Sequence, residues 1–348
     1  MAPRATPHRM LAPPPLPRTV EASFRDLTST KPQVRMSSIE DLARHALRDP
    51  VVRGRALPLL ERALHDDFAG VRSTAAVALA DMKAKEALPA LLVTIEDPDP
   101  HVRQMALSAL GEIGDPRAAP RLLRALVDDR PEVRYQAIIA YARVADDDDA
   151  LRALAVATDD ADESVRYIAL RLVEERVDAG KREGLKDIVR RAQSMLGAPP
   201  PHVAVVAAIL LAKLADEGAK RVLLAVADGT FRLPRGPAQE DEREAVELCG
   251  ALGLVEAIPA LERRAFGLKH FVADTCAYAA TIALARLGHG RAKDEILRGL
   301  RSRRREQREA SVVAVGRARL KEARPIVAGL TGNDVDPELV AHALEELG

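Results

Sequence analysis

The chain has 348 residues, 47% of them hydrophobic and 3% aromatic, and its 52 basic and 52 acidic side chains leave a net charge of zero. The apolar fraction is ample for a core, and the charge balance argues against a nucleic-acid binder of the strongly basic kind. No apolar run approaches the roughly 20 residues of a membrane span, and no signal peptide is recognisable, so a cytoplasmic location is expected. Cys249 and Cys276 fall on packing positions and are interpreted as buried side chains rather than a redox or metal pair.

Residues 1–20 are rich in proline and are expected to form a disordered tail. The segment 97–127 then shows the pattern that organises the chain. Pro100 opens a predicted helix whose apolar residues recur at helical spacing up to Gly114, and Asp115-Pro116 begins a second helix. One such hairpin cannot bury its apolar faces, so it requires copies on both sides.

The copies are found by taking Val102 as a reference position and aligning the other segments of the chain on it. A small residue stands four places later and an apolar one eight places later, in segments spaced 31 to 38 residues apart. Small side chains at a fixed place let neighbouring helices approach closely, so the fold is predicted to be all-α, an α-solenoid of about nine antiparallel helix hairpins. The small-residue column is Ser38, Ala75, Ala106, Ala137, Ala169, Ala207, Ala245, Ala280 and Ser311.

The pattern of an aspartate, then Val-Arg, then alanine, then Leu-Gly resembles HEAT repeats, in the short bacterial form shared with bilin-lyase-like proteins. The resemblance covers about residues 25 to 348 and implies the fold rather than a specific function, since the family includes scaffolds, regulators, nucleic-acid binders and a few enzymes. It also implies that the second helix of each hairpin lines the concave face. The Val-Arg pairs that carry the resemblance are Val34-Arg35, Val71-Arg72, Val102-Arg103, Val133-Arg134 and Val165-Arg166.

Residues 21–196 are predicted to hold regular repeats 1 to 5, and residues 197–348 the less regular repeats 6 to 9 of the same continuous solenoid. The longest internal loop is expected at 229–241, where a tolerated insertion and a functional loop are equally good interpretations. The segment 334–348 is predicted to be one capping helix. The run of aspartates at 146–149 lacks the spacing of a calcium loop and is interpreted as a solvated turn before a helix.

The Val-Arg arginines are predicted to form an internal ladder with aspartates of the same or the next repeat. Asp66, Asp97, Asp128 and Asp160 stand five residues before four of the reference valines, where they can cap helices or pair with a guanidinium group. We favour this structural interpretation of Arg35, Arg72, Arg103, Arg134 and Arg166 over ligand binding.

The second helices carry a different set of arginines on their non-core side, and a dense cluster stands at 301–308. Guanidinium groups suit carboxylates and phosphates, so these faces predict a basic groove, although a solvated surface explains them equally well. The predicted partner-binding residues are Arg117, Arg121, Arg124, Arg190, Arg191, Arg221, Arg263, Arg264, Arg298, Arg301, Arg303, Arg304 and Arg305.

The favoured hypothesis is a non-enzymatic scaffold or adaptor that binds an acidic protein surface or peptide along a basic concave face. The first alternative is binding of a nucleic-acid backbone by the same arginines. The second is a bilin-lyase-like accessory enzyme, which is implied by the resemblance alone. No catalytic residue, cofactor or metal site is predicted, and the sequence leaves the oligomeric state open.

Overall fold

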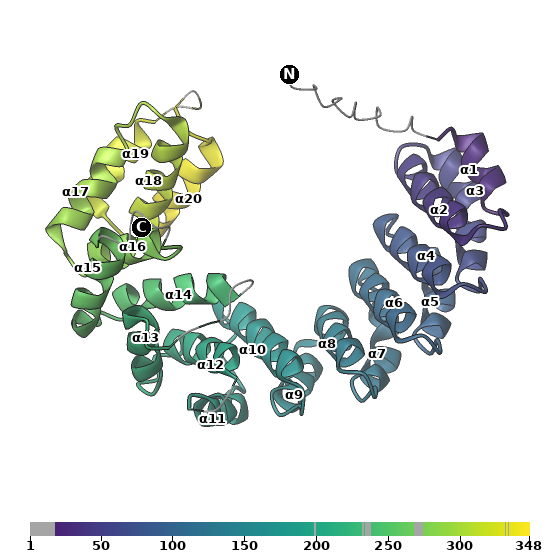
Figure 1. Cartoon of the computed structure of the whole chain (residues 1–348), viewed down its shortest axis with the longest axis horizontal. Coiled ribbons are helices and arrows are strands. Elements are labelled where there is room, and N and C mark those ends of the chain that lie inside the picture. The colour runs from purple at the N-terminus through teal and green to yellow at the C-terminus, as the bar shows by residue number, and fades with distance from the viewer. Residues whose placement is uncertain are drawn as a thin grey trace, which may run out of the picture. The chain divides into compact units, whose positions relative to one another are not determined.

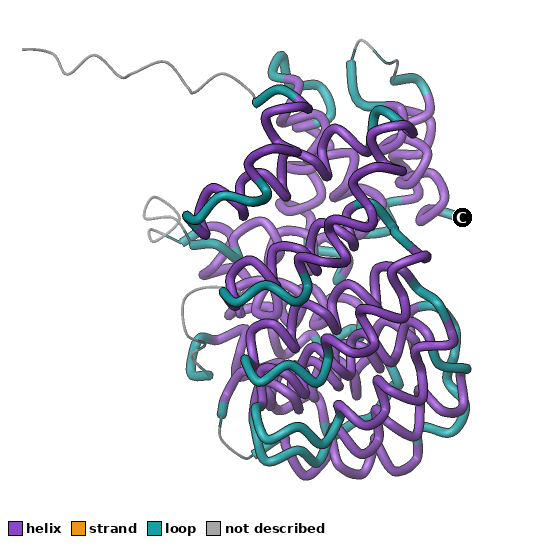
Figure 2. The backbone as a smooth tube through the Cα atoms, turned by 90° about the vertical axis from the view of Figure 1, so that its right-hand side faces the viewer, coloured by secondary structure: helices purple, strands orange, loops and turns teal. Residues whose placement is uncertain are grey.

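The computed structural model describes residues 18–197, 200–231, 233, 238–267, 274–330, 332 and 334–348. Within these ranges the chain is built of helices joined by short loops and contains no strand (Figure 2). The chain divides into two units, residues 1–150 and residues 151–348, which are described separately below. The predicted all-α solenoid is confirmed.

Unit 1 consists of a short leading helix and successive helix hairpins (Figure 1). Single turns of 3-10 helix, η1 (Lys85–Ala87) and η2 (Pro116–Ala118), lead into two of the second helices. The last helix, α9, begins in unit 1 and ends in unit 2. The helices are α1 (Val20–Asp26), α2 (Pro32–Ala46), α3 (Pro50–Ala63), α4 (Ala69–Asp81), α5 (Leu88–Thr94), α6 (Pro100–Ile113), α7 (Ala119–Ala125), α8 (Pro131–Val144) and α9 (Asp147–Ala157).

Unit 2 continues the alternation of first and second helices. Its helices are α10 (Glu163–Asp178), α11 (Lys186–Met195), α12 (Pro201–Lys213), α13 (Ala219–Asp228), α14 (Ala238–Ala251), α15 (Ile258–Phe266), α16 (Ala277–Arg286), α17 (Gly290–Gly299), α18 (Arg305–Arg317), α19 (Arg324–Ala328) and α20 (Pro337–Leu347). Across the described residues, the even-numbered helices α2 to α18 are the nine first helices that the small-residue column predicted. Helix α20 is the predicted capping helix.

Local sequence sets the ends of the helices, as α6 shows. The Asp99 carboxylate accepts hydrogen bonds from the backbone N–H groups of His101 and Val102, and Pro100 occupies the first turn, where its missing N–H is not needed. Gly114 ends the helix with a φ of 69°, a left-handed conformation that favours glycine. The same position, twelve residues after the reference, is left-handed in six repeats: at Lys83, Gly114, Ala215, Gly253, Gly288 and Arg319.

The small-residue column explains how closely the first helices pack. Ala75, Ala106 and Ala137 are fully buried between successive first helices. At Gly111 a Cβ atom would lie 3.0 Å from the Cα of Ala140 in the next first helix, so the two backbones nearly touch. Figure 1 shows that α4, α6 and α8 follow one another as one row, and that α5 and α7 lie beside this row in a second one.

This packing corrects one expectation from the resemblance, namely that the second helices line the concave side. In unit 1 the first helices α2, α4, α6 and α8 contact one another, whereas contacts between successive second helices are sparse. A stack of helices bends toward the row whose members lie closer together. The first helices, and not the arginine-bearing second helices, therefore form the concave side of this unit.

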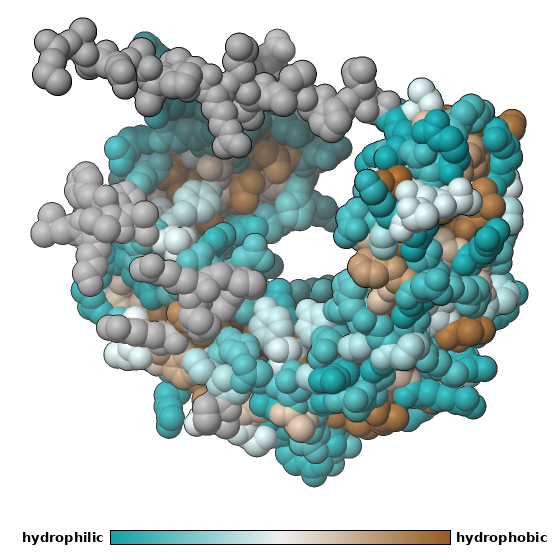
Figure 3. Space-filling model, turned by 45° about the vertical axis from the view of Figure 1, so that its right-hand side comes forward, coloured by the Kyte–Doolittle hydropathy of each residue, from teal (hydrophilic) through white to brown (hydrophobic). Residues whose placement is uncertain are grey.

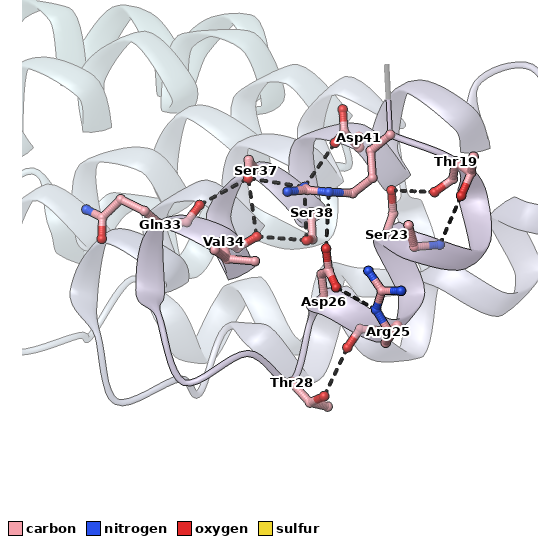
Figure 4. A network of polar contacts seen from close by, with 12 residues as sticks. Thr19, Ser23, Arg25, Asp26, Thr28, Gln33, Val34, Ser37, Ser38 and Asp41 are labelled. Atoms are coloured by element: carbon pink, nitrogen blue, oxygen red, sulfur yellow. Dashed lines mark hydrogen bonds and ion pairs between the residues drawn. The ribbon is translucent and has the colours of Figure 1, made fainter. Parts of the chain in front are cut away.

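The stack begins at a polar cap built on Arg18. Its guanidinium group donates hydrogen bonds to Ser37 at 3.1 Å, Ser38 at 3.2 Å and Asp41 at 3.1 Å on α2, and it also pairs with Asp26 (Figure 4). In the next three repeats the position of Asp41 is taken by a buried alanine, Ala78, Ala109 or Ala140. In α2 this position is polar and binds Arg18, which lies just before α1 in the chain. Of the predicted tail, residues 1–17 lie outside the described residues.

Candidate functional site

The predicted arginine ladder is present in unit 1 and joins successive repeats. The Arg35 guanidinium group contacts both carboxylate oxygens of Asp66, at 2.8 and 2.6 Å. Arg72 binds Asp97 in the same way at 2.7 and 2.8 Å, and Arg103 binds Asp128 at 2.9 and 2.8 Å. We call these three pairs the arginine ladder. Each of these three arginines therefore pairs with the loop of the next repeat, which is one of the two alternatives that the sequence left open.

Each ladder arginine also donates a hydrogen bond to a backbone carbonyl in the loop of its own repeat. Arg72 donates from its other Nη to the carbonyl oxygen of Asp66, at 2.9 Å, so Asp66 is held by two successive arginines. Burial alone would raise the carboxyl pKa, but hydrogen bonds from Arg35 and from the Phe68 N–H outweigh it and lower the pKa of Asp66. The ladder side chains are at most 16% exposed, which assigns them to the framework rather than to ligand binding.

Most of the predicted partner-binding arginines have contacts inside the protein. Arg117 pairs with Asp115 at 2.7 Å, Arg190 with Asp187 at 3.1 Å and Arg305 with Glu309 at 2.8 Å, all on exposed guanidinium groups. Such exposed pairs stabilise a fold little. Further contacts join Arg121 to Glu96, Arg191 to the carbonyl of Ala155, Arg298 to the carbonyl of Asp294, and place Arg263 near Asp228.

Arg264 differs from the others because its side chain is only 13% exposed. It donates hydrogen bonds to the carbonyl oxygens of Ala227 at 2.7 Å and Val226 at 2.8 Å, and to Glu242 at 2.9 Å. Its guanidinium group thus satisfies the C-terminal carbonyls of α13. Arg264 is a packing residue between α13, α14 and α15.

Three of the predicted arginines form an exposed basic loop between α17 and α18. Arg301, Arg303 and Arg304 are exposed, and none has a side-chain hydrogen bond or ion pair to any residue that the structure describes. Arg124 and Arg221, on α7 and α13, are likewise exposed without such a contact in the described part of the chain. Of the predicted site, only these five side chains retain a guanidinium group directed wholly to solvent.

The first helices present a second surface, which the sequence analysis did not single out. It consists of the residues three, six and ten places after the reference, and we call it the first-helix face. In unit 1 this face contains a cavity of about 540 Å³ lined by Met36, Val77 and Met105, with Glu40 and Asp81 at its border. Hydrophobic side chains on the face in view in Figure 3 form separate patches among hydrophilic ones.

In unit 2 the first-helix face is charged. A cavity of about 460 Å³ lies there, lined by residues of five first helices, the capping helix and the loop after α18, and we call it the charged cavity. Its lining residues are Asp178, Lys213, Glu244, Glu247, Leu248, Ala251, Ile282, Arg286, Gly316, Arg317, Arg319 and Glu346.

One end of the charged cavity is a network of ion pairs joining α10, α12 and α14. The Lys213 ammonium group contacts Glu174, Asp178 at 2.8 Å and Glu244 at 2.7 Å. The Arg171 guanidinium group donates to Glu174 at 2.6 Å and to Glu244 at 3.0 Å. Three first helices are thereby connected through two cations.

The network contains more carboxylates than cations, and Glu174 and Asp241, which both pair with Arg171, are buried. Burial, reinforced by the neighbouring Glu244 carboxylate, raises the pKa of Glu174 to about 7. Burial also raises the pKa of Asp241, which accepts a hydrogen bond from the Tyr167 hydroxyl at 3.1 Å. The raised pKa values favour the protonated forms of Glu174 and Asp241. Protonation reduces the negative charge of a site that contains only two cations.

One member of this network, Lys213, belongs to a charged column that the sequence displays. The residue ten places after the reference is charged in every repeat except the seventh, which has alanine. Comparing this column, as the small-residue column was compared, identifies a charged stripe along the first helices. The column is Arg44, Asp81, Glu112, Arg143, Glu175, Lys213, Ala251, Arg286 and Arg317.

Comparison with known proteins agrees with this architecture. Residues 56–142 and 90–174 match a family model described as HEAT repeats. The chain is an α-solenoid, and residues 56–174 match HEAT repeats. No curated protein matches it.

Among solved structures, the fold resembles YIBA_ECOLI, an Escherichia coli protein, with 19% identity over 78% of this chain and 92% of that one and a TM-score of 0.53. It also resembles Kap121p, with 11% identity over 94% of this chain and 41% of that one and a TM-score of 0.57. The complex of CpcE and CpcF of phycocyanin lyase from Nostoc sp. PCC7120 matches with 19% identity over 84% of this chain and 98% of that one, at a TM-score of 0.36.

Membrane spans and metal centres are both absent from the described residues. None of the helices there has the length and apolar composition needed to cross a membrane. No group of three or more histidine, cysteine, aspartate or glutamate side chains in the same residues is arranged to hold a metal ion. Cys249 and Cys276 are both fully buried, as their positions in the sequence predicted.

Proposed function

We propose that this HEAT-repeat chain is a non-catalytic scaffold that binds a partner protein through an acidic segment of that partner. HEAT solenoids in general serve as protein-interaction scaffolds, and this chain shares their fold. Stacked helices hold many contacts in a fixed arrangement, so little conformational entropy is lost when a partner binds. Arginine pairs with carboxylates then set the orientation and the rate of association.

The observation that carries the proposal is the basic loop. Arg301, Arg303 and Arg304 lie within four residues of one another and are exposed, and their guanidinium groups have no carboxylate neighbour among the residues that the structure describes. Like charges held this close repel, whereas arginines such as Arg117, Arg190 and Arg305 are each paired with an acid. An acidic partner segment supplies the missing counter-charge.

The test is affinity capture from a native lysate treated with nuclease, comparing wild type with Arg301, Arg303 and Arg304 all changed to glutamate. A protein that wild type retains and the variant loses supports the proposal. The matched control changes Arg48, Arg62 and Arg182 to glutamate, which reverses three equally exposed charges elsewhere, and it is expected to capture the same protein. Partners that survive the basic-loop variant overturn the proposal, and so does recovery of nucleic acid alone without nuclease.

A further inference from the structure

The charged cavity of unit 2 extends beyond the network around Lys213. Arg286, Arg317 and Arg319 line it from α16, α18 and the loop after α18, together with Glu247 of α14 and Glu346 of α20. With Lys213, Asp178 and Glu244, the lining holds four cations and four carboxylates. The net charge of the lining therefore does not show which groups lack a partner, and the individual contacts decide it.

The internal contacts show which arginines lack an anion. Arg317 is occupied, because its Nη1 contacts both carboxylate oxygens of Glu247, at 3.1 and 3.4 Å. Arg286 is half-buried, and the hydrogen bond it donates goes to the carbonyl oxygen of Arg317, at 3.1 Å, rather than to a carboxylate. Burial and the neighbouring Arg319 charge lower the pKa of Arg286, although Glu346 and Glu247 oppose this. Arg286 and Arg319 are thus two like charges that approach each other at a cavity wall.

We propose that the charged cavity binds a carboxylate side chain of the acidic partner segment between Arg286 and Arg319. This inference rests on the proposed function and names the site at which the segment is anchored. A single carboxylate there accepts hydrogen bonds from two guanidinium groups that have no ion pair with any residue that the structure describes. Asp178, Glu244, Glu247 and Glu346 line the same cavity and repel further negative charge, so the cavity takes one carboxylate while the rest of the segment stays outside.

Helix α18 relates this anchor to the basic loop. The basic loop immediately precedes α18, and the anchor residues Arg317 and Arg319 stand at and just beyond its C-terminus. Thirteen residues of helix extend about 20 Å at 1.5 Å per residue. An extended peptide of about six residues covers that length, so one short acidic segment has the reach to contact both sites.

Arg319 can be replaced in a binding test without an expected loss of stability. It has a φ of 52°, in the left-handed region where glycine is favoured, and three other repeats do have glycine at this position. Arg319→Gly therefore removes the guanidinium group while relieving the backbone, so its unfolding midpoint is expected to stay the same or rise. Lys83→Gly is the matched control, since Lys83 has a φ of 47° at the same position of a repeat in unit 1.

The probe is a fluorescently labelled octaglutamate peptide, and its affinity for the full chain is measured by fluorescence anisotropy. Arg319→Gly and Arg286→Gln are each expected to weaken binding about tenfold, the loss expected for a charge-assisted hydrogen-bonded pair. Lys83→Gly is expected to leave the affinity unchanged.

The outcomes separate this inference from the proposed function. Peptide binding that Arg319→Gly leaves intact, but that reversal of the basic-loop charges abolishes, overturns the carboxylate anchor and keeps the scaffold. Peptide binding that depends on neither site overturns both. Tighter binding of an octathymidylate oligonucleotide, with the same sensitivity to Arg319→Gly, overturns the choice of a carboxylate over a phosphate.

Discussion

Units 1 and 2 use the same helix hairpin but place their charged side chains differently. In unit 1 the ion pairs of the arginine ladder lie at the loops, and the first-helix face has a cavity lined partly by Met36, Val77 and Met105. In unit 2 three successive repeats have alanine or glutamate where the ladder arginine would stand, and ion pairs on the first-helix face join α10, α12 and α14. The repeat thus has two separate positions at which charge links neighbours.

The difference shows how one framework acquires a specific surface. Pairs at the loops hold successive repeats of unit 1 together, and on its first-helix face the ion pair of Arg143 and Glu112 is about half exposed. Pairs on the face itself link helices and also leave charged groups at a cavity wall, where they are available to a ligand. We infer that ion pairs at the loops stabilise unit 1, whereas in unit 2 the first-helix face serves both stability and the proposed recognition of a partner.

The largest effect on stability is expected when a pair of the arginine ladder is broken. Arg72→Ala leaves the Asp97 carboxylate, 8% exposed, without its bidentate partner, and is expected to lower the free energy of unfolding of unit 1 by about 2 to 3 kcal/mol. Hydrogen exchange of α4 and α6 amides is the measurement, because it reports on unit 1 separately. The control is Arg117→Ala, which removes a 73% exposed partner of Asp115 and is expected to change little. Equal effects of the two variants would show that the ladder is not structural.

The second prediction concerns pH and the network of unit 2. The pKa of Glu174 rises from 4.5 to about 7 on folding, so between these values the native state holds a proton that the unfolded chain has lost. This contribution to stability is present at low pH and disappears as the pH rises through 7. Glutamine at this position does not titrate.

The stability of Glu174→Gln relative to wild type is therefore expected to increase by about 1 to 2 kcal/mol between pH 5 and pH 8. Denaturant unfolding at a series of pH values, with exchange of α10 amides to localise the effect, measures it. Val77→Ala, on the first-helix face of unit 1, is the control and should show no such trend, because neither side chain titrates. A difference that stays constant with pH would mean that Glu174 is ionised throughout.

The third prediction compares the closeness of packing in the two units. A Cβ at Gly250 would lie 2.6 Å from the Cα of Ala283, whereas one at Gly111 would lie 3.0 Å from the Cα of Ala140. Gly250→Ala is expected to destabilise by about 1 kcal/mol, because overpacking against backbone outweighs the gain in helix propensity. Gly111→Ala is expected to be nearly neutral, since the two terms offset each other. Thermal unfolding of both variants checks the order, which equal stabilities would contradict.

Much of the fold is determined by short-range rules that a single sequence displays. The small-residue column predicted nine first helices because helix packing demands a small side chain at one fixed place. The ladder was predicted because each repeat places an aspartate loop and a Val-Arg arginine at fixed positions, and the structure shows that the arginine pairs with the loop of the next repeat, as Arg72 does with Asp97. Both inferences rely on a regular period, which unit 1 keeps best.

The candidate site was harder to predict because it depends on relations between repeats. Glu174 and Glu244 are separated by 70 residues and occupy different columns of the repeat, so no period connects them, yet both contact Lys213. Which row of helices is concave also depends on packing distances between neighbours, and here the resemblance led to the wrong row. Charge counting found the exposed arginines but could not show that Arg264 is packed between helices.

The arginine ladder has a consequence for how the chain can vary in length. Because Asp66 is gripped by the arginine of its own repeat and by that of the preceding one, a residue inserted between Asp66 and Arg72 disturbs two rungs at once. The repeats themselves vary in length, since Val34 and Val71 stand 37 residues apart although the Arg35–Asp66 pair spans that interval, whereas Val71 and Val102 stand 31 residues apart. The interval from each ladder aspartate to the following reference valine is five residues throughout, so the ladder fixes this junction and leaves length to vary elsewhere in the repeat.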